Sequence, residues 1–219
     1  MSGEAHTPPL GYAALTPFYD RAIAALTREA VWRARLVHHL NPQRSEAILD
    51  VGSGTGSLAI ATTAVQPECN FRGIDPDRSA VTIARRKAAL AGSGATFEIG
   101  RLEERPVDGE RFDKIVCSLV LHQVPLAEKR RMLGAMHDWL KPGGHVFIAD
   151  YGRQPTLATR LAFRLTVQML DGKADTQPNA DGVLPALVDE AGFGVPTILD
   201  TINTITGRIE IIGARKSPA

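Results

Sequence analysis

The sequence has little of what marks a nucleic-acid-binding, disulfide-bonded or membrane-spanning protein. Its formal net charge is only +1 over 219 residues, so no bulk field draws it to nucleic acid. The two cysteines, Cys69 and Cys117, lie beside expected strands, which favours buried free thiols over a disulfide framework. No apolar run approaches the length of a membrane span, and the polar segment Met1–Pro9 is unlike a signal peptide. We therefore expect one cytoplasmic domain with a substantial core.

The most informative segment is residues 50–57, which read Asp-Val-Gly-Ser-Gly-Thr-Gly-Ser. It follows an apolar run typical of a short buried strand, and a helix is expected to start near Ser57. Glycines reach positive φ and let another molecule lie against bare backbone. The helix start adds free N–H groups and the positive end of a dipole. This layout predicts the first βα turn of a nucleotide-binding α/β sheet.

The spacing of the glycines indicates which nucleotide the turn holds. Dinucleotide sites use G-x-G-x-x-G/A, whereas here the third glycine comes one residue early and Ser57 stands where Gly or Ala is expected. A nicotinamide dehydrogenase is therefore disfavoured, and no Gly-Lys-Ser/Thr follows to make a Walker A loop. The pattern Asp50-x-Gly52-x-Gly54-x-Gly56 instead resembles the first motif of class I S-adenosylmethionine-dependent methyltransferases. A plain tight turn is the alternative interpretation.

Later segments follow in the order that this family shows. Asp75 ends a second expected strand about 20 residues after the turn, where such folds place a ribose-binding carboxylate. Its alternative role is to cap the next helix, but Asp77 is better placed for that. Residues 112–122 and 140–150, the second containing Lys-Pro-Gly-Gly, resemble the fourth- and fifth-strand motifs of the same methyltransferases.

The resemblance implies an α/β fold, a single Rossmann-like methyltransferase domain. Its mostly parallel seven-stranded sheet would have helices on both faces and a C-terminal antiparallel hairpin. We divide the domain, 1–219, into an N-terminal helical lid (1–42), a cofactor-binding core (43–153) and C-terminal helices and hairpin (154–219). The expected strands are 46–51, 70–75, 96–99, 112–118, 145–150, 196–204 and 208–215. The expected helices are 16–40, 57–65, 78–91, 127–140, 156–170 and 183–191, with a polar loop at 171–181.

The same resemblance implies that the chain binds S-adenosylmethionine and releases S-adenosylhomocysteine. Many relatives carry an acidic residue after the third strand's glycine, which accepts from the adenine amino group. Here Arg101 follows Gly100, and arginine is donor-only. We expect Leu102 to pack on the ring and Glu103 or a backbone carbonyl to accept from the amino group instead. Arg101 is expected to be solvated or paired with Glu103 or Glu104. The expected cofactor-binding residues are Asp50, Gly52, Gly54, Gly56, Asp75, Pro76, Leu102 and Ser118, and no metal site is expected.

Methyl transfer needs two molecules held in line, water excluded and sometimes a proton removed. His122 follows the fourth strand at the carboxyl edge and is the candidate general base. The alternative is a histidine that braces this loop against a neighbouring helix. Tyr19 lies in a segment like the lid of ubiquinone/menaquinone-biosynthesis and phospholipid N-methyltransferases, and either closes over the cofactor or packs its ring. Tyr151, after the fifth strand, is a candidate to line the substrate pocket.

We therefore expect methyl transfer from S-adenosylmethionine to O, N, S or activated C of a small-molecule acceptor. The alternatives are a non-catalytic cofactor-binding regulatory protein and, less favoured, a protein methyltransferase. Nucleic acid is not an expected partner, because the Asn/Asp-Pro-Pro-aromatic motif of base-amino methylation is absent. Arg160 and Arg164, one helical turn apart, form either a basic stripe facing an acidic substrate or lipid headgroup, or a solvated helix face. Peripheral lipid contact is thus open, as is the oligomeric state.

Overall fold

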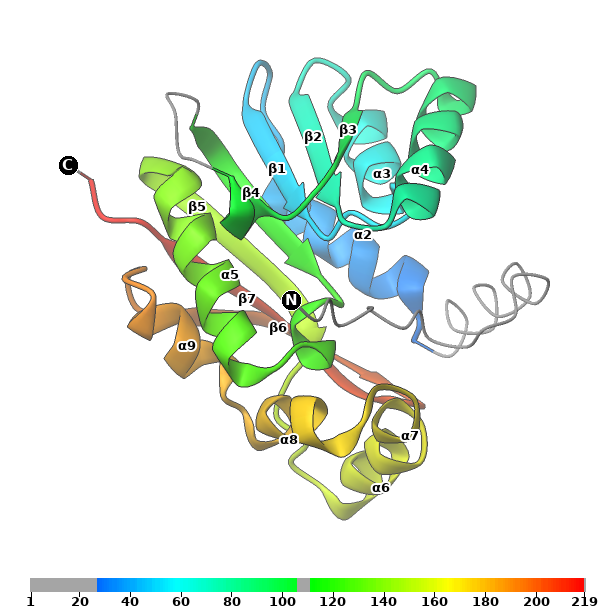
Figure 1. The fold of residues 1–219 in the computed structure, drawn as a ribbon, viewed down its shortest axis with the longest axis vertical. Helices are drawn as coiled ribbons and strands as arrows, with labels where there is room; N and C mark the ends of the chain where they lie inside the picture. Colours follow the sequence, from blue (N-terminus) through cyan, green and yellow to red (C-terminus); the bar gives the residue numbers. More distant parts are fainter. Residues whose placement is uncertain (1–26, 106–110, 219) are drawn as a thin grey trace, which may run out of the picture.

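The computed structural model describes residues 27–105 and 111–218. Its strands are β1 (Ala47–Val51), β2 (Asn70–Asp75), β3 (Thr96–Ile99), β4 (Phe112–Ser118), β5 (Leu140–Tyr151), β6 (Thr197–Thr204) and β7 (Gly207–Arg215). They form one seven-stranded sheet in the order β3-β2-β1-β4-β5-β7-β6, which crosses the centre of Figure 1. β1 to β5 pair in parallel, while β7 pairs antiparallel with both β5 and β6. The predicted sheet and its C-terminal hairpin are confirmed.

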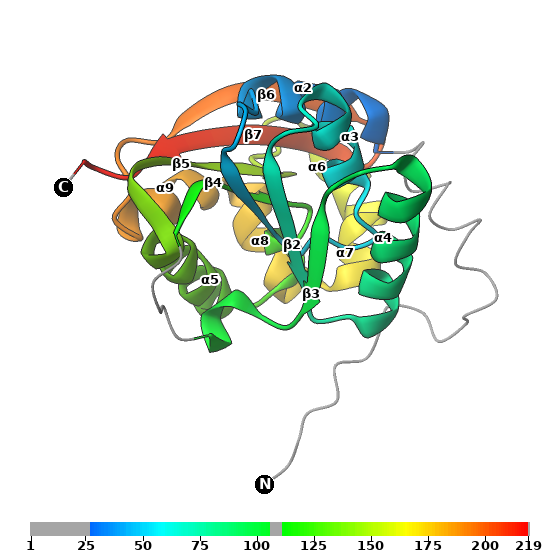
Figure 2. The same cartoon turned by 90° about the horizontal axis from the view of Figure 1, so that it is seen from above.

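Helices cover both faces of the sheet. The α-helices are α2 (Glu29–Leu40), α3 (Ser57–Val65), α4 (Arg78–Ala91), α5 (Leu126–Trp139), α6 (Leu157–Leu165), α7 (Val167–Asp171), α8 (Lys173–Asp181) and α9 (Leu184–Glu190). Two short 3-10 helices are η1 (Leu102–Glu104) and η2 (Leu121–Gln123). One hydrophobic core joins α2, α3 and α4 to the sheet, and a second joins α5 and α9 to the opposite face. Figure 2 shows α5 and α9 across the strands from α2.

The central strands form where apolar residues predominate in the sequence, since a parallel strand is buried on both faces. In β1, four of the five residues are buried, and the exception, Ala47, begins the strand. The carboxyl ends of β1, β2, β3, β4 and β5 meet at one edge of the sheet, where ligands of such folds bind. The glycine turn and the residues that follow β2, β3 and β4 are thereby brought together.

The predicted polar loop at 171–181 is wrong, because residues Lys173–Asp181 form α8. Pro178 lies inside this helix, where it removes one backbone hydrogen bond and disfavours a helical prediction. Contacts from distant segments compensate for this loss. Lys129 Nζ donates to the Asp175 carbonyl at 2.9 Å, and Asn179 Nδ2 donates to the Tyr151 carbonyl at 2.9 Å.

The helix predicted at 156–170 is two helices, α6 and α7, which break at Thr166 (φ −118°, ψ −80°). The Thr166 hydroxyl donates to the Ala162 carbonyl at 2.7 Å, a bond that competes with the regular helix backbone. Of the helix predicted at 16–40, the structure describes α2, and the earlier part lies outside the described residues. Within 27–105 and 111–218, no helix is both long enough and apolar enough to cross a bilayer.

Candidate active site

The glycine turn joins β1 to α3 at the carboxyl edge of the sheet. Gly52, Gly54 and Gly56 have φ of 77°, 51° and 76°, so all three use the left-handed region that glycine tolerates. A Cβ on Gly52 would overlap the Val120 side chain, and one on Gly56 would lie 2.8 Å from the Phe97 ring. A Cβ on Gly54 would meet nothing within 4 Å. Two of the glycines are therefore required by packing, while the backbone of Gly54 faces open space.

Asp75 ends β2 beside this turn and is 9% exposed. One of its carboxylate oxygens accepts from the Gly54 amide at 2.8 Å, and the other accepts from the Asp77 amide at 2.9 Å. Asp77 accepts from the Ser79 amide at 2.7 Å and is the N-cap of α4, as the sequence predicted. Because a carboxylate offers about four lone-pair positions, Asp75 keeps acceptor capacity for two ligand hydroxyls. Pro76 follows it and is exposed.

Asp50 is the buried acidic group of the site, with an exposed fraction of 1%. No described residue donates a hydrogen bond to its Oδ1 atom. Burial, followed by the negative charge of Asp75, raises the pKa of this carboxyl to about 7, against the opposing effect of the Arg33 charge. A buried carboxylate oxygen without a hydrogen-bond donor is costly. The position is therefore suited to a cationic ligand group that would pair with it.

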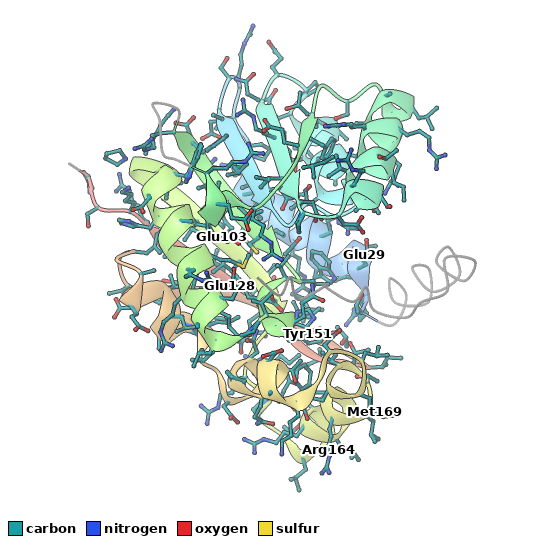
Figure 3. All side chains as sticks on the ribbon, viewed as in Figure 1. Glu29, Glu103, Glu128, Tyr151, Arg164 and Met169 are labelled. Carbon is teal, nitrogen blue, oxygen red and sulfur yellow. The ribbon has the colours of Figure 1, made fainter. Side chains whose placement is uncertain are left out.

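The segment after β3 was expected to contact adenine. The Arg101 guanidinium lies 3.7 Å from a Glu103 oxygen and 3.8 Å from a Glu104 oxygen, so the predicted pairing is confirmed. It also lies 3.7 Å from Glu128 on α5, and Figure 3 shows Glu103 and Glu128 near each other. Leu102 is 2% exposed and packs in the core beneath α5.

The loop after β4 presses against the glycine turn. Ser118, the last residue of β4, is half-buried at this edge. Leu119 has φ 54°, and such a left-handed conformation costs a non-glycine residue roughly 1–2 kcal/mol. Its amide donates to the Ala149 carbonyl at 2.9 Å, which holds the residue against β5. The next residue, Val120, fills the space beside Gly52. Backbone strain of this kind persists where the surrounding structure fixes it, often at functional sites.

His122, on η2, is held between two carboxylates. Its Nδ1 lies 2.7 Å from Asp150 Oδ1, and its amide donates to Asp150 Oδ2 at 3.2 Å. Its Nε2 lies 3.5 Å from Asp171 Oδ2, at the end of α7. Desolvation lowers the pKa of His122, but the charges and hydrogen bonds of Asp150 and Asp171 outweigh it and raise that pKa to about 9. The ring is therefore a cation at neutral pH.

A buried lysine ties the same loop to α8. Lys129 is 0% exposed, and its ammonium donates to the carbonyls of Leu121, Val124 (2.7 Å) and Asp175 (2.9 Å). Burial lowers the pKa of this ammonium, against the charges of Asp150 and Asp175. The loop that carries His122 is thus fastened to α7 by Asp171 and to α8 by Lys129.

Tyr151 is 4% exposed, and its hydroxyl lies 2.7 Å from the Thr206 hydroxyl. Its ring packs edge-on against His122, with centroids 5.1 Å apart, and burial raises the pKa of the phenol to about 12. Figure 3 shows Tyr151 between the sheet and α6–α8. Cys69 and Cys117 are buried and free, as expected. Tyr19 lies outside the described residues.

Sequence reasoning missed the partners of the site residues more than the residues themselves. Asp150 belonged to a recognised segment but had no expected role, and Asp171 fell in the supposed loop. Arg33, on α2, lowers the pKa of Asp50 although it lies nearly 20 residues earlier in the sequence. An acidic residue after an apolar run at the carboxyl end of a strand, as Asp150 is in β5, was the one local signal available.

The chain matches a model of the methyltransferase domain over residues 48–144. It is 26% identical to a demethylmenaquinone methyltransferase of Thermus thermophilus over 202 residues, which are 90% of each chain. It is 30% identical to an arsenite methyltransferase of Halobacterium salinarum over 154 residues, 68% of this chain and 37% of that protein. It is 26% identical to a ubiquinone/menaquinone biosynthesis C-methyltransferase of Geotalea daltonii, over 63% of this chain and 60% of that protein.

Solved structures show the same fold. A Thermotoga maritima S-adenosylmethionine-dependent methyltransferase superposes with a TM-score of 0.69 at 19% identity, over 92% of this chain and 96% of that one. A magnesium protoporphyrin IX methyltransferase from Synechocystis with bound S-adenosylmethionine gives 0.62 at 22% identity, over 95% of this chain and 86% of that one. Residues 48–144 therefore form a methyltransferase domain, and the chain is similar to class I S-adenosylmethionine-dependent methyltransferases of the ubiquinone/menaquinone-biosynthesis group.

Proposed function

We propose that the acceptor is a hydroxylated aromatic ring, a demethylated quinol precursor, which is methylated at an activated ring carbon. The observation that carries this proposal is the likeness to the demethylmenaquinone methyltransferase, which extends over 90% of both chains. A ring carbon activated by a hydroxyl group loses its proton to solvent after it has been alkylated. Such an acceptor therefore does not require a protein base in the same step.

The glycine turn and its two acidic neighbours fit the cofactor. When bound, S-adenosylmethionine supplies an electrophilic methyl group. The backbone at Gly54 would lie against it, since a Cβ there would meet nothing within 4 Å. Asp75 would accept from the two ribose hydroxyls, and Asp50, whose Oδ1 has no hydrogen-bond donor, would face the ammonium group. The remaining proposed contacts are Gly52, Gly56, Pro76, Leu102 and Ser118.

We propose that His122 positions the site rather than acting as its general base. A base must be unprotonated before it reacts, but the two carboxylates beside His122 keep its ring charged at neutral pH. Both ring nitrogens already face these carboxylates. The histidine would then fix the loop after β4, and with it Leu119 and Val120 beside the cofactor turn.

The division of the chain stays a prediction: an N-terminal helical lid at 1–42 that includes Tyr19, a cofactor-binding core at 43–153, and C-terminal helices and a hairpin at 154–219. The cytoplasmic location is likewise a prediction.

A thiophilic acceptor such as arsenite is less suited to this chain. Soft acceptors of that kind are held by thiolates. The sequence has two cysteines, both are buried, and burial raises the pKa of the Cys117 thiol well above its usual range. Neither residue is placed to hold an acceptor as a thiolate.

The test is transfer of labelled methyl to a short-chain demethylmenaquinol, a catechol, a thiol, arsenite and phosphatidylethanolamine, with the product identified by mass spectrometry. We expect a ring-carbon product from the quinol. Methylation of arsenite or of an amine in preference to every ring acceptor would refute the acceptor class and leave the enzyme class intact.

A further inference from the structure

α6 and α7 carry a row of exposed apolar side chains at one end of the molecule. We call this row the apolar ridge; it consists of Leu157 (87% exposed), Leu161 (57%), Leu165 (59%), Met169 (75%) and Leu170 (47%). Its first three members are spaced four residues apart and so share one face of α6. The opposite face of the helix buries Phe163, which is 1% exposed. α6 thus has two apolar faces, one packed in the core and one exposed to solvent.

Cations border the apolar ridge. Arg160, Arg164 and Lys173 line a cavity of about 170 Å³ between α6, α7 and α8. Its lining has one carboxylate, Asp181, which already accepts from Gln177 at 3.0 Å. In the described part of the chain, neither Arg164 nor Lys173 has an ion pair or a side-chain hydrogen bond. These two positive charges are therefore available to an external partner.

The two features lie side by side on α6. At 3.6 residues per turn, the row of Arg160 and Arg164 is rotated by roughly 80° from the row of Leu157, Leu161 and Leu165. Both rows are exposed. A helix with an apolar face flanked by Arg and Lys is the arrangement that lies in a membrane interface, with apolar side chains among the lipids and cations at the phosphates. Figure 3 shows Arg164 and Met169 together at the α6–α7 end.

We propose that this face docks on a bilayer that contains anionic phospholipid. The apolar ridge enters the headgroup boundary, and Arg160, Arg164 and Lys173 pair with lipid phosphates. A second copy of the chain fits less well. A two-fold interface places the same patch on both sides, and this patch would then bring like charges together. An anionic bilayer satisfies both the exposed apolar area and the two unpaired cations, Arg164 and Lys173, while Arg160 also donates to the Gln154 carbonyl at 2.9 Å.

The docking face adjoins the loop after β4. α7 ends in Asp171 beside His122, and α8 supplies the Asp175 carbonyl to Lys129. Docking would therefore bring the loop after β4 close to the lipid surface. Membrane binding itself does not depend on the identity of the acceptor, and it can be measured without cofactor.

The test is co-sedimentation of the full chain with vesicles of phosphatidylcholine alone or mixed with phosphatidylglycerol. We expect binding to the mixed vesicles that weakens as salt is added, and little binding to phosphatidylcholine. Because each cation near an anionic surface contributes about fivefold in affinity, Arg164→Glu combined with Lys173→Glu should reduce binding at least 25-fold, or roughly fivefold for each cation. Leu161→Glu should reduce it at least tenfold, as an apolar contact is lost and a negative charge is added.

Two variants on α4 are matched controls. Leu90 is 83% exposed and Arg86 is also exposed. Figure 1 shows their helix, α4, at the opposite end of the molecule from α6 and α7. Leu90→Glu and Arg86→Glu make the same chemical changes and should leave vesicle binding within twofold. Equal losses in the controls, or no binding to either vesicle, would overturn the proposal. So would a dimer in light scattering that Leu161→Glu dissociates.

Methyl transfer to a soluble acceptor separates this proposal from the proposed function. Leu161→Glu should leave that rate unchanged, because Leu161 has no part in the cofactor site. Loss of vesicle binding with normal transfer supports docking, whereas an inactive wild type that still binds vesicles would contradict only the proposed acceptor.

Discussion

Replacing Asp50 by asparagine should change stability in a way that depends on pH. Burial raises the pKa of this carboxyl from 3.8 to about 7. A raised carboxyl pKa means that folding favours the protonated form. In the wild type, burial of this charge therefore costs no unfolding free energy below about pH 4. The cost increases as pH rises and is complete above pH 7. At 1.36 kcal/mol per pKa unit, the full penalty is roughly 4 kcal/mol.

The asparagine side chain has no charge to desolvate, so Asp50→Asn should gain stability relative to wild type as pH rises. The difference in unfolding free energy between the two proteins should move in favour of the variant by up to about 4 kcal/mol from pH 4 to pH 8. Urea denaturation at several pH values measures it. Asp75→Asn is the control, because Asp75 accepts from two backbone amides and its loss should destabilise the protein at both ends of the range.

The same carboxyl should report cofactor binding. An ammonium group beside Asp50 would lower its pKa, so binding near pH 7 should release roughly half a proton. Calorimetry in buffers of different ionisation enthalpy measures that release, and Asp50→Asn should abolish it and weaken binding. A variant whose relative stability is the same at pH 4 and pH 8 would refute the buried-charge reasoning.

Three further predictions concern the same edge of the sheet. Asp75→Ala should weaken S-adenosylmethionine binding at least tenfold in calorimetry, since charge-assisted bonds on the order of 1.5–3 kcal/mol are lost; unchanged affinity would leave Asp75 a purely structural role. Gly54→Ala should fold with a strain cost of about 1 kcal/mol and bind cofactor poorly. Gly52→Ala should lower the melting temperature further, because its new methyl group would overlap the Val120 side chain. Equal melting temperatures of the two variants would argue against this distinction. His122→Ala should keep turnover within a few-fold and lose up to about 3 kcal/mol of unfolding free energy at pH 6. This loss should shrink as pH rises through 9, because a histidine whose pKa is raised on folding stabilises the fold only at pH values below that pKa. A fall in turnover of about 10²–10⁴ would instead show that His122 is the general base.

The parallel half of the fold could be predicted from the sequence because its signals are local. The elements at 57–65, 70–75, 78–91, 96–99 and 112–118 begin and end where the sequence places them. The buried strands are short segments rich in apolar residues, and each is followed by a turn with characteristic residues. The assignment of the α4 cap to Asp77 rests on the same kind of local rule.

The helices α6 to α8 and their contacts with the loop after β4 could not be predicted in this way. α8 contains Pro178 and forms because Lys129 and Asn179 bond across distant segments. The charge of His122 depends on Asp150 and Asp171, which come from β5 and α7. Periodicity and propensity carry no information on such pairings, so the sequence indicates the histidine and not its protonation state.

The buried ammonium of Lys129 limits how this enzyme could be re-engineered. Its three acceptors are the carbonyls of Leu121, Val124 and Asp175. One side chain of α5 therefore satisfies backbone carbonyls both in the loop after β4 and in α8. A graft that exchanges residues 153–183 for the corresponding part of another methyltransferase would leave that ammonium short of an acceptor unless the new backbone supplies one there. Chimeras intended to change acceptor choice should therefore take α5 together with the α6–α8 segment, as one exchangeable unit.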